Sequence, residues 1–192
     1  MFYIQKIIEI DIEIEKYYKS FEPKSGEVIK DNARKHGHKP KFNLQQELYV
    51  DFSTIPGVHT LTVQTIISEV GTDMSRWKSE KHFVAWLELS PANKITGEKV
   101  FSTRTRKVIN RAATAFRIAA LATGKTQTSL GSFIRRIKVG KRAPKAVTAT
   151  ARKIACLFYR LLKFGQAYVE QGVANYEQTY KEKLVLSEFR EM

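Results

Sequence analysis

The stretch PKAVTATARKIACLFYRLLKF, residues 144–164, decides the fold class. Apolar side chains recur in it at intervals of three or four residues, which is the spacing of one face of an α-helix; they are Val147, Ala151, Ile154, Phe158 and Leu161. Pro144 suits the first turn of a helix, where its missing N–H needs no partner. The stretch therefore predicts a long amphipathic helix that ends at Gly165 or Gly172.

Outward from this stretch, other segments show the same helical spacing. Residues 61–70, 75–89 and 105–123 carry apolar faces, and glycines follow the first and the last of them at positions 71 and 124. Glycine is a common residue at the end of a helix. The sequence therefore predicts an all-α, mainly helical fold. Two further expectations are a helix-hairpin-helix-like element and a short β-hairpin around residues 93–103.

The N-terminal residues 2–21 fit two patterns. Apolar residues recur at intervals of four and three, as on one helix stripe; they are Tyr3, Ile7, Ile10, Ile14, Tyr17 and Phe21. The isoleucines at 8, 10, 12 and 14 also alternate, as in a strand. The length and the many Glu and Lys residues favour a helix. A short coiled coil that pairs with a partner helix remains open.

The positive charge is concentrated in one segment. The chain of 192 residues has 33 Lys and Arg against 19 Asp and Glu, a net charge of +14. Residues 94–163 contain 18 of these cations and one acid, Glu98. Such segregation is typical of proteins that bind polyanions, which favours nucleic acid, with an anionic membrane surface as the main competitor.

Several classes of protein are excluded by composition. The chain has one cysteine, Cys156, so an intrachain disulfide or a thiolate metal centre cannot form. No apolar run is long enough for a membrane span, and the N-terminus lacks the order of charges of a signal peptide. We expect a cytoplasmic protein without a membrane partner.

A Pro-Gly turn precedes the predicted helix over 61–70. A turn that feeds a helix presents backbone N–H groups at the positive end of the helix dipole, and such groups can hold a phosphate. The pattern is typical of a helix-hairpin-helix element, although His59 stands where that element usually has a second glycine. An ordinary turn between helices is the alternative. The residues predicted to bind nucleic acid here are Gly57, Val58, His59 and Thr60.

The loop NKITGEKVFSTRTRK, residues 93–107, places hydroxyl groups among cations. Cations around the hydroxyl of Thr96 or Ser102 can hold a phosphate and stabilise charge that develops on it. The alternative is that these hydroxyls cap a helix or only contact phosphate. The residues predicted to bind nucleic acid in and after this loop are Lys94, Lys99, Ser102, Arg104, Arg106, Lys107 and Arg111. No carboxylate pair, Walker-type loop or Ser-His-Asp order accompanies them.

A family resemblance adds to this interpretation. The runs IPGVHTLTVQTIISEVGTDMSRWKSEKHFVAWLELSPANKITGEKVFSTRTRKVINRAATAFRIAA and SLGSFIRRIKVGKRAPKAVTATARKIACLFYRLLKFGQAYVEQG resemble the C-terminal transposase domain of the IS-one-ten family of bacterial insertion sequences. The likeness covers residue 51 to about residue 172. It implies a role in DNA transposition by strand cleavage and rejoining, guided by a structured bridge RNA.

The resemblance also implies roles for single residues. Family members have an N-terminal RuvC-like domain with four acids that bind magnesium, a coiled coil, and a C-terminal domain with a nucleophilic serine. Thr96 falls at the position of that serine, Glu98 at the second glycine of a Ser-Gly-Gly loop, and Glu88 where members usually have glycine. The β-branched Thr96 and the negative Glu98 are both unfavourable for attack on a phosphate.

The resemblance therefore implies a truncated copy that is inactive alone. We expect a helical or coiled-coil segment over residues 1–21, a linker over 22–43, the transposase domain over 44–172 and a helical tail over 173–192. No cofactor is expected in this chain, because the family's magnesium belongs to the N-terminal domain. The expected partners are DNA, a guide RNA, and a second copy or a full-length transposase. A non-catalytic DNA- or RNA-binding regulator is the alternative, and the expected location is the bacterial cytoplasm, with the nucleoid.

Overall fold

The structure is a computed structural model, and it describes residues 2–20, 50–91, 94–96, 99–102, 105, 110–140, 143–165 and 178. The α-helices in this part of the chain are α1 (Phe2–Lys19), α3 (Thr60–Val70), α4 (Glu80–Trp86), α5 (Arg111–Thr123), α6 (Ser129–Gly140) and α7 (Ala143–Phe164). It also contains the 3-10 helices η1 (Phe52–Thr54) and η2 (Met74–Arg76) and the strands β1 (Lys94–Thr96) and β2 (Lys99–Ser102). The prediction of a mainly helical fold is confirmed.

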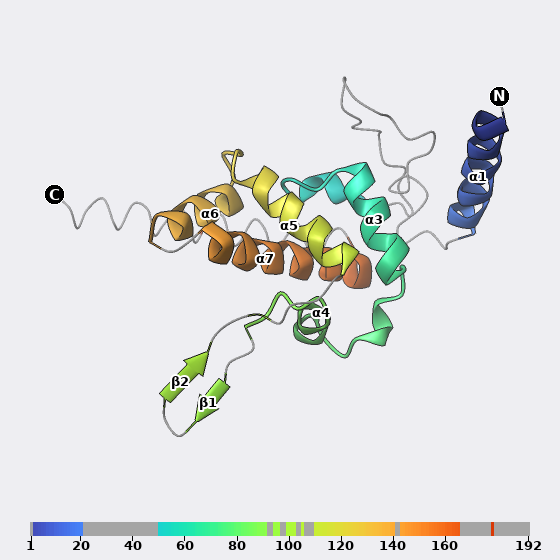
Figure 1. Ribbon diagram of the computed structural model, residues 1–192. Helices are drawn as coiled ribbons and strands as arrows, with labels where there is room; N and C mark the ends of the chain where they lie inside the picture. The colour runs from blue at the N-terminus through green and yellow to red at the C-terminus, as the bar shows by residue number, and fades with distance from the viewer. Residues whose placement is uncertain are drawn as a thin grey trace.

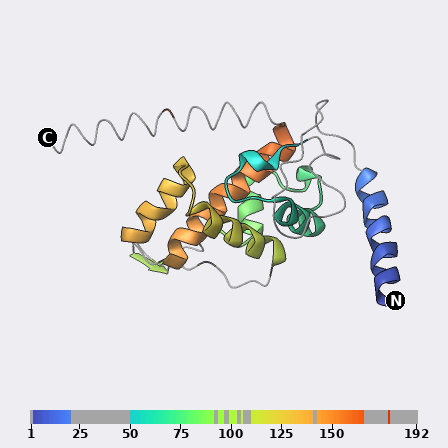
Figure 2. The same ribbon diagram turned by 90° about the horizontal axis from the view of Figure 1, so that it is seen from above.

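The long helix α7 lies at the centre of the helical body (Figure 1). Helices α4, α5 and α6 and the short η2 all pack against it, and α3 packs on α5. Seen from above, α6 lies beside the N-terminal half of α7 (Figure 2). Pro144 is in the first turn of α7, and Gly165 follows its last residue with a φ of 82°. Since L-residues with side chains rarely adopt such a φ, glycine suits this helix end.

Aromatic rings fill the space between α7 and its neighbours. Phe158 of α7 stacks on Phe52 of η1 at 4.8 Å between ring centroids and meets Phe116 of α5 edge-on at 5.5 Å. Phe83 of α4 meets Phe116 in turn at 6.3 Å. All four rings are fully buried. This cluster joins four elements that are far apart in the sequence, and such ring pairs add about 0.5–1.5 kcal/mol each beyond the area they bury.

Polar contacts connect α7 to η2 and α4. The hydroxyl of the buried Tyr159 donates a hydrogen bond of 3.0 Å to the carbonyl oxygen of Trp77 and accepts one of 2.9 Å from Lys163 Nζ. The guanidinium of Arg160 donates from Nε and Nη2 to the two carboxylate oxygens of Glu80 in α4. The contacts of Tyr159 with Trp77 and of Arg160 with Glu80 each span about eighty residues of sequence. They position α4 and the chain before it on α7.

Two helix starts differ from the sequence-based prediction. The 75–89 segment begins with η2, whose cap is Asp73 because its Oδ1 accepts from the Ser75 N–H at 2.8 Å, and α4 begins only at Glu80. The segment predicted from residue 105 begins at Arg111 as α5, because the Asn110 side chain accepts from the Ala113 N–H at 3.1 Å. A capping side chain downstream of the predicted start thus sets the first turn of α5, whereas the residue before α4, Ser79, makes no side-chain cap hydrogen bond.

Helix α1 lies apart from the helical body in both ribbon views (Figures 1 and 2). Its large apolar side chains are exposed, with Tyr3 at 81% of its full accessible area; the others are Phe2, Ile4, Ile7, Ile8, Ile10, Ile12, Ile14 and Tyr17. Tyr18 near its end is buried. An exposed apolar surface of this extent marks a site of interaction with another surface. None of the helices in the described part of the chain is long and apolar enough to cross a membrane.

Candidate nucleic-acid interface

A β-hairpin carries the hydroxyl that the sequence singled out. Strand β1 pairs antiparallel with β2, with Thr96 opposite Lys99, Ile95 opposite Val100 and Lys94 opposite Ser102. The hairpin extends away from the helices (Figure 1). Residues 97 and 98 at its tip lie outside the described part. The two strands are thus set apart from the core, where a large ligand can reach them.

The structure brings Thr96 and Lys99 together. Directly opposite residues of an antiparallel pair have their Cβ atoms about 4.5–5.5 Å apart on the same face. Both side chains are exposed. A hydroxyl and an ammonium group are therefore neighbours at the end of the hairpin, which is an arrangement that can contact one phosphate. Among the described side chains, no carboxylate or imidazole forms a hydrogen bond with the Thr96 hydroxyl.

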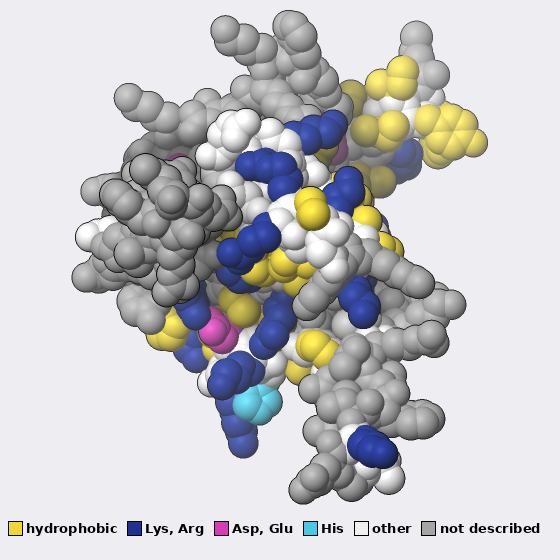
Figure 3. Space-filling model, turned by 90° about the vertical axis from the view of Figure 1, so that its left-hand side faces the viewer, with side chains coloured by type: hydrophobic (Ala, Val, Ile, Leu, Met, Phe, Trp, Pro, Cys, Tyr) yellow, Lys and Arg dark blue, Asp and Glu magenta, His cyan; other side chains and the backbone are white. Residues whose placement is uncertain are grey.

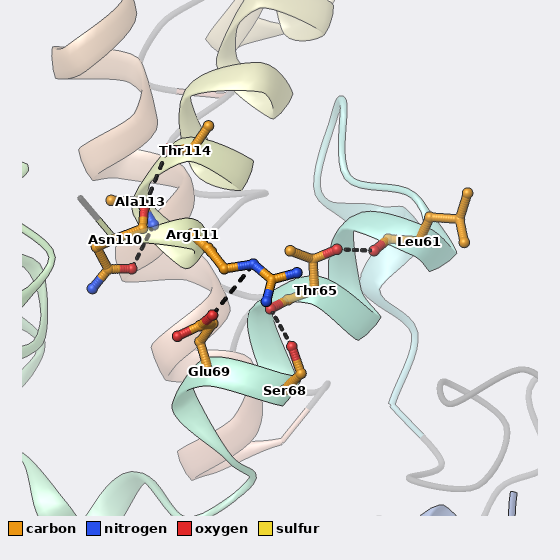
Figure 4. A network of polar contacts seen from close by, with 8 residues as sticks. All are labelled: Leu61, Thr65, Ser68, Glu69, Asn110, Arg111, Ala113 and Thr114. Atoms are coloured by element: carbon orange, nitrogen blue, oxygen red, sulfur yellow. Dashed lines mark hydrogen bonds and ion pairs between the residues drawn. The ribbon is translucent and has the colours of Figure 1, made fainter. Parts of the chain in front are cut away.

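Arg111 stands at the first turn of α5, where the chain returns to the helical body (Figure 4). The cap residue Asn110 fixes this turn by accepting from the Ala113 N–H, and its carbonyl accepts from Thr114 Oγ1 at 3.1 Å. The Arg111 side chain is 78% exposed, and its Nε lies 3.5 Å from Glu69 Oε1 of α3. At this distance and exposure the pair is weak. Arg111 is therefore available to an incoming anion.

A shallow groove of about 360 Å³ lies beside Arg111, between α3 and α5. Its lining consists of Leu61, Thr62, Thr65, Arg111, Thr114, Ala115 and Ile118. The hydroxyls of Thr65 and Ser68 on α3 donate to backbone carbonyls of their own helix, as Figure 4 shows, so they do not line up as donors for a ligand. Arg111 is the charged residue of this lining, so an anion held here would meet the guanidinium.

The Pro-Gly turn before α3 is held by packing on α5. Gly57 has a φ of 83°, and a Cβ atom there would lie 2.3 Å from the carbonyl oxygen of Ala119. The buried Thr123 hydroxyl lies 2.6 Å from the carbonyl oxygen of Pro56, to which it can donate. The Val58 N–H donates to the Ile55 carbonyl oxygen at 3.1 Å, and the Val58 side chain is buried. Close packing thus explains the glycine, and Val58 has neither its side chain nor its N–H available to a phosphate.

The other residues predicted around this turn remain candidates. His59 precedes α3 as an exposed residue, and Thr60 is the first residue of the helix and half-buried. A 3-10 helix, η1, lies on the other side of the turn. The helix-hairpin-helix interpretation and the nucleic-acid role of these residues stay predictions.

Part of the predicted cation cluster falls outside the described residues. Arg104, Arg106 and Lys107 belong to that part of the chain, and Lys94 and Ser102 are described by their backbone pairing alone. The residues that the structure does place from the predicted set are Thr96 and Lys99 on the hairpin and Arg111 on α5. The contribution of the others to one continuous surface stays a prediction.

Helices α6 and α7 carry exposed cations that the predicted site residues did not include. Figure 3 shows Lys and Arg side chains spread over one side of the molecule. From residue 110 to residue 165 the chain has no Asp or Glu. Arg136, Lys145 and Arg152 are exposed, whereas Arg135 donates to the carbonyl oxygens of Gly124 and Thr126 and thus supports the turn between α5 and α6. The absence of acids over this stretch was the sequence signal that could have identified the surface.

The described residues do not contain a metal centre. No group of three or more His, Cys, Asp or Glu side chains lies close enough to hold an ion in the ranges that the structure describes. Burial raises the pKa of the Cys156 thiol, and the Glu80 carboxylate raises it further, against Arg152 and Arg160, which lower it. The thiol therefore stays protonated at neutral pH and is a poor nucleophile.

Fold and surface charge together define a class of protein: a mainly helical domain with an exposed cationic surface. Residues 51–133 match the sequence profile of the Transposase IS116/IS110/IS902 family. The resemblance to the IS-one-ten family is thereby confirmed over this segment, and the match supports a role related to transposition. The segment contains α3, α4, the hairpin, α5 and the start of α6. No curated protein and no solved structure matches the chain.

Proposed function

We propose that the chain binds DNA through the β-hairpin and the cationic residues that follow it, and that it contributes this surface to strand cleavage and rejoining during transposition. The observation that carries the proposal is the pair of Thr96 and Lys99, exposed side by side on a hairpin outside the core. The hairpin lies within the segment that matches the transposase family. The predicted cations Arg104, Arg106 and Lys107 would extend this surface toward Arg111.

Thr96 is the proposed point of contact with the reacting phosphate. The ammonium group of Lys99 can stabilise negative charge on that phosphate. A threonine hydroxyl needs a base or a metal ion to become a nucleophile, and neither accompanies Thr96 in the described part of the chain. We therefore propose that the chain alone does not cleave DNA and that a separate acidic, magnesium-binding domain completes the site.

The proposed partners follow from this incomplete site and, for the RNA, from the family resemblance. A structured guide RNA would supply the choice of DNA, and a second copy or a full-length transposase would supply the acidic domain. A location in the bacterial cytoplasm, on the nucleoid, fits these partners. If the threonine loop cannot react at all, the chain acts as a DNA- or RNA-binding regulator of full-length copies.

A trapped covalent adduct tests the proposed function. The chain is incubated with a family RuvC-like domain, bridge RNA, magnesium and a suicide DNA substrate, and both binding and adduct formation are measured. We expect DNA binding that weakens steeply with added salt, because Lys and Arg contacts to phosphates displace counterions. An adduct with the added domain, abolished in Thr96→Ala and retained or increased in Thr96→Ser, would establish Thr96 as the reacting group.

The controls separate binding from reaction. The variant with Arg104, Arg106 and Lys107 changed to Gln should bind DNA more weakly and with a smaller salt slope. DNA binding without an adduct from either the unmodified chain or Thr96→Ser would favour the regulator. Cleavage by the chain on its own would contradict the proposed division of labour, and failure of the unmodified chain to bind any DNA would contradict the proposed function itself.

Helix α1 favours a second, compatible role in association. Its exposed side chains Ile7 and Ile14 are seven residues apart, on one side of a helix. Burial of such side chains between two helices stabilises a pair by about 25 cal/mol per Å² of apolar area removed from water. We propose that α1 pairs with the same helix of a second copy or of a full-length transposase.

A further inference from the structure

Two cations, one from α6 and one from α7, meet at the seam between the two helices. The ammonium group of Lys153 on α7 lies 3.9 Å from the ring centroid of Phe133 on α6, and the Arg136 guanidinium lies 6.0 Å from the same centroid. Arg152 precedes Lys153 and is exposed, and it points about 100° around the axis of α7 from Lys153, toward solvent. Lys145 precedes Arg152 by seven residues, which is two helical turns, and thus lies on the same side of α7. Arg136, Lys145, Arg152 and Lys153 form what we call the α6–α7 basic face.

The ion pairs that the described carboxylates form with α5 and α7 involve cations outside this face. Among the described residues, they join Glu69 to Arg111 and Glu80 to Arg160. No ion pair joins a described carboxylate to Arg136, Lys145 or Arg152. Like charges held together without counter-charges repel one another, and a polyanion relieves that repulsion. The face is therefore arranged for an external anion.

The shape and composition of the face indicate which anion it fits. Lys145 and Arg152 are about 10 Å apart along α7 from the helical rise alone, so the face can meet several phosphates of one backbone. The ring of Phe133 is partly exposed, but the Lys153 ammonium lies over it. A surface that binds single strands usually offers open aromatic rings on which bases stack. The described residues of this face offer cations instead.

A membrane surface fits the same face less well. Helices that bind anionic membranes insert an apolar side between the lipids. The apolar sides of α6 and α7 are used inside the protein, where Leu130, Ile134, Ile154 and Phe158 are buried. The exposed large apolar side chains of these helices are Val139 on α6 and Phe164 at the end of α7, which do not form the continuous apolar side that membrane binding requires.

We propose that the α6–α7 basic face binds the phosphate backbone of double-stranded DNA. The proposal rests on the proposed function, that the chain binds DNA, and adds to it a second surface apart from the hairpin. Except for the first turn of α6, this face lies beyond the segment that matches the transposase family. The α6–α7 basic face binds the duplex without sequence specificity, because contacts to phosphates carry no direct information about the bases.

Two variants of equal charge test the proposal. The first changes Arg136, Lys145 and Arg152 to Gln, and the second changes Lys78, Lys81 and Lys125, which are also exposed but lie elsewhere on the body. Binding of a duplex DNA is measured by fluorescence anisotropy at several salt concentrations, and thermal unfolding verifies that both variants are folded. The first variant should lose at least about tenfold in affinity, and its log Kd–log salt slope should fall by up to about 3, since each phosphate contact contributes about 0.9.

The second variant should keep the affinity and the slope of the unmodified chain to within a small factor. An equal loss of DNA affinity in both variants, or no loss in the first variant, would overturn the proposal. The proposed function would still stand in that case if the unmodified chain binds DNA. Parallel titrations use the same sequence as duplex RNA, single-stranded DNA, and vesicles of anionic and neutral lipid. A loss in the first variant confined to RNA, single strands or vesicles would also overturn it. An unmodified chain that binds no DNA would contradict both proposals.

Discussion

At the scale of single residues, Glu88 has a backbone conformation that is unfavourable for a residue with a side chain. Its φ is 55°, and it is the one described residue other than glycine with a positive φ. The family resemblance places a glycine here. A side chain in the left-handed region costs roughly 1–2 kcal/mol because its Cβ crowds the following carbonyl oxygen. The geometry of the turn after α4 thus gives a physical reason for a glycine at this position.

Replacing Glu88 with glycine should therefore stabilise the protein. We expect Glu88→Gly to raise the free energy of unfolding by up to about 1 kcal/mol, after the greater chain entropy of glycine in the unfolded state is subtracted. Urea unfolding measures the change. Glu88→Ala is the matched control, because it removes the carboxylate but keeps the Cβ. An equal gain in both variants would mean that charge rather than backbone strain is responsible.

At the scale of elements, the ion pair between α4 and α7 should contribute more to the stability of the folded protein than the ion pair between α3 and α5. Arg160 binds Glu80 through two guanidinium nitrogens, and both side chains are partly buried, whereas Arg111 and Glu69 meet through one nitrogen at 3.5 Å. A double-mutant cycle with Gln at both positions should give a coupling free energy of about 0.5–1.5 kcal/mol between Glu80 and Arg160. The cycle for Glu69 and Arg111 should give a value close to zero. Comparable coupling energies in the two cycles would contradict this ranking.

The elements show what a sequence can and cannot predict. The spacing of apolar residues predicted the segments that form α3, α5 and α7, because a helix that packs on a core must repeat every 3.6 residues. The helix starts were harder, since the caps Asp73 and Asn110 act through side-chain geometry. Thr96 was suggested by a hydroxyl among cations and then by the family resemblance, and not by the periodicity of apolar residues. Contacts between distant residues, such as Thr123 with Pro56, had no periodic signal at all.

At the scale of the whole molecule, the exposed apolar residues of α1 predict self-association. Sedimentation velocity over a range of concentrations should detect a dimer, and Ile7→Gln with Ile14→Gln should shift the equilibrium to monomer, because both side chains are exposed on one side of α1. Leu61→Gln with Ile118→Gln is the control, since these residues are exposed on the helical body. A chain that stays monomeric at every concentration, or a dimer lost equally in the control, would contradict the prediction.

The central position of α7 has a consequence for how the chain folds during synthesis. Phe52, Phe83 and Phe116 are made early, but the ring that completes their cluster, Phe158, belongs to the last helix of the body. Domains generally fold as units while the ribosome extends them. The apolar faces of the earlier helices therefore stay exposed to solvent until α7 has left the exit tunnel and can pack against them. A ribosome that stalls at the end of the family-matched segment, near residue 133, would hold a chain without its central helix and leave a natural target for chaperones.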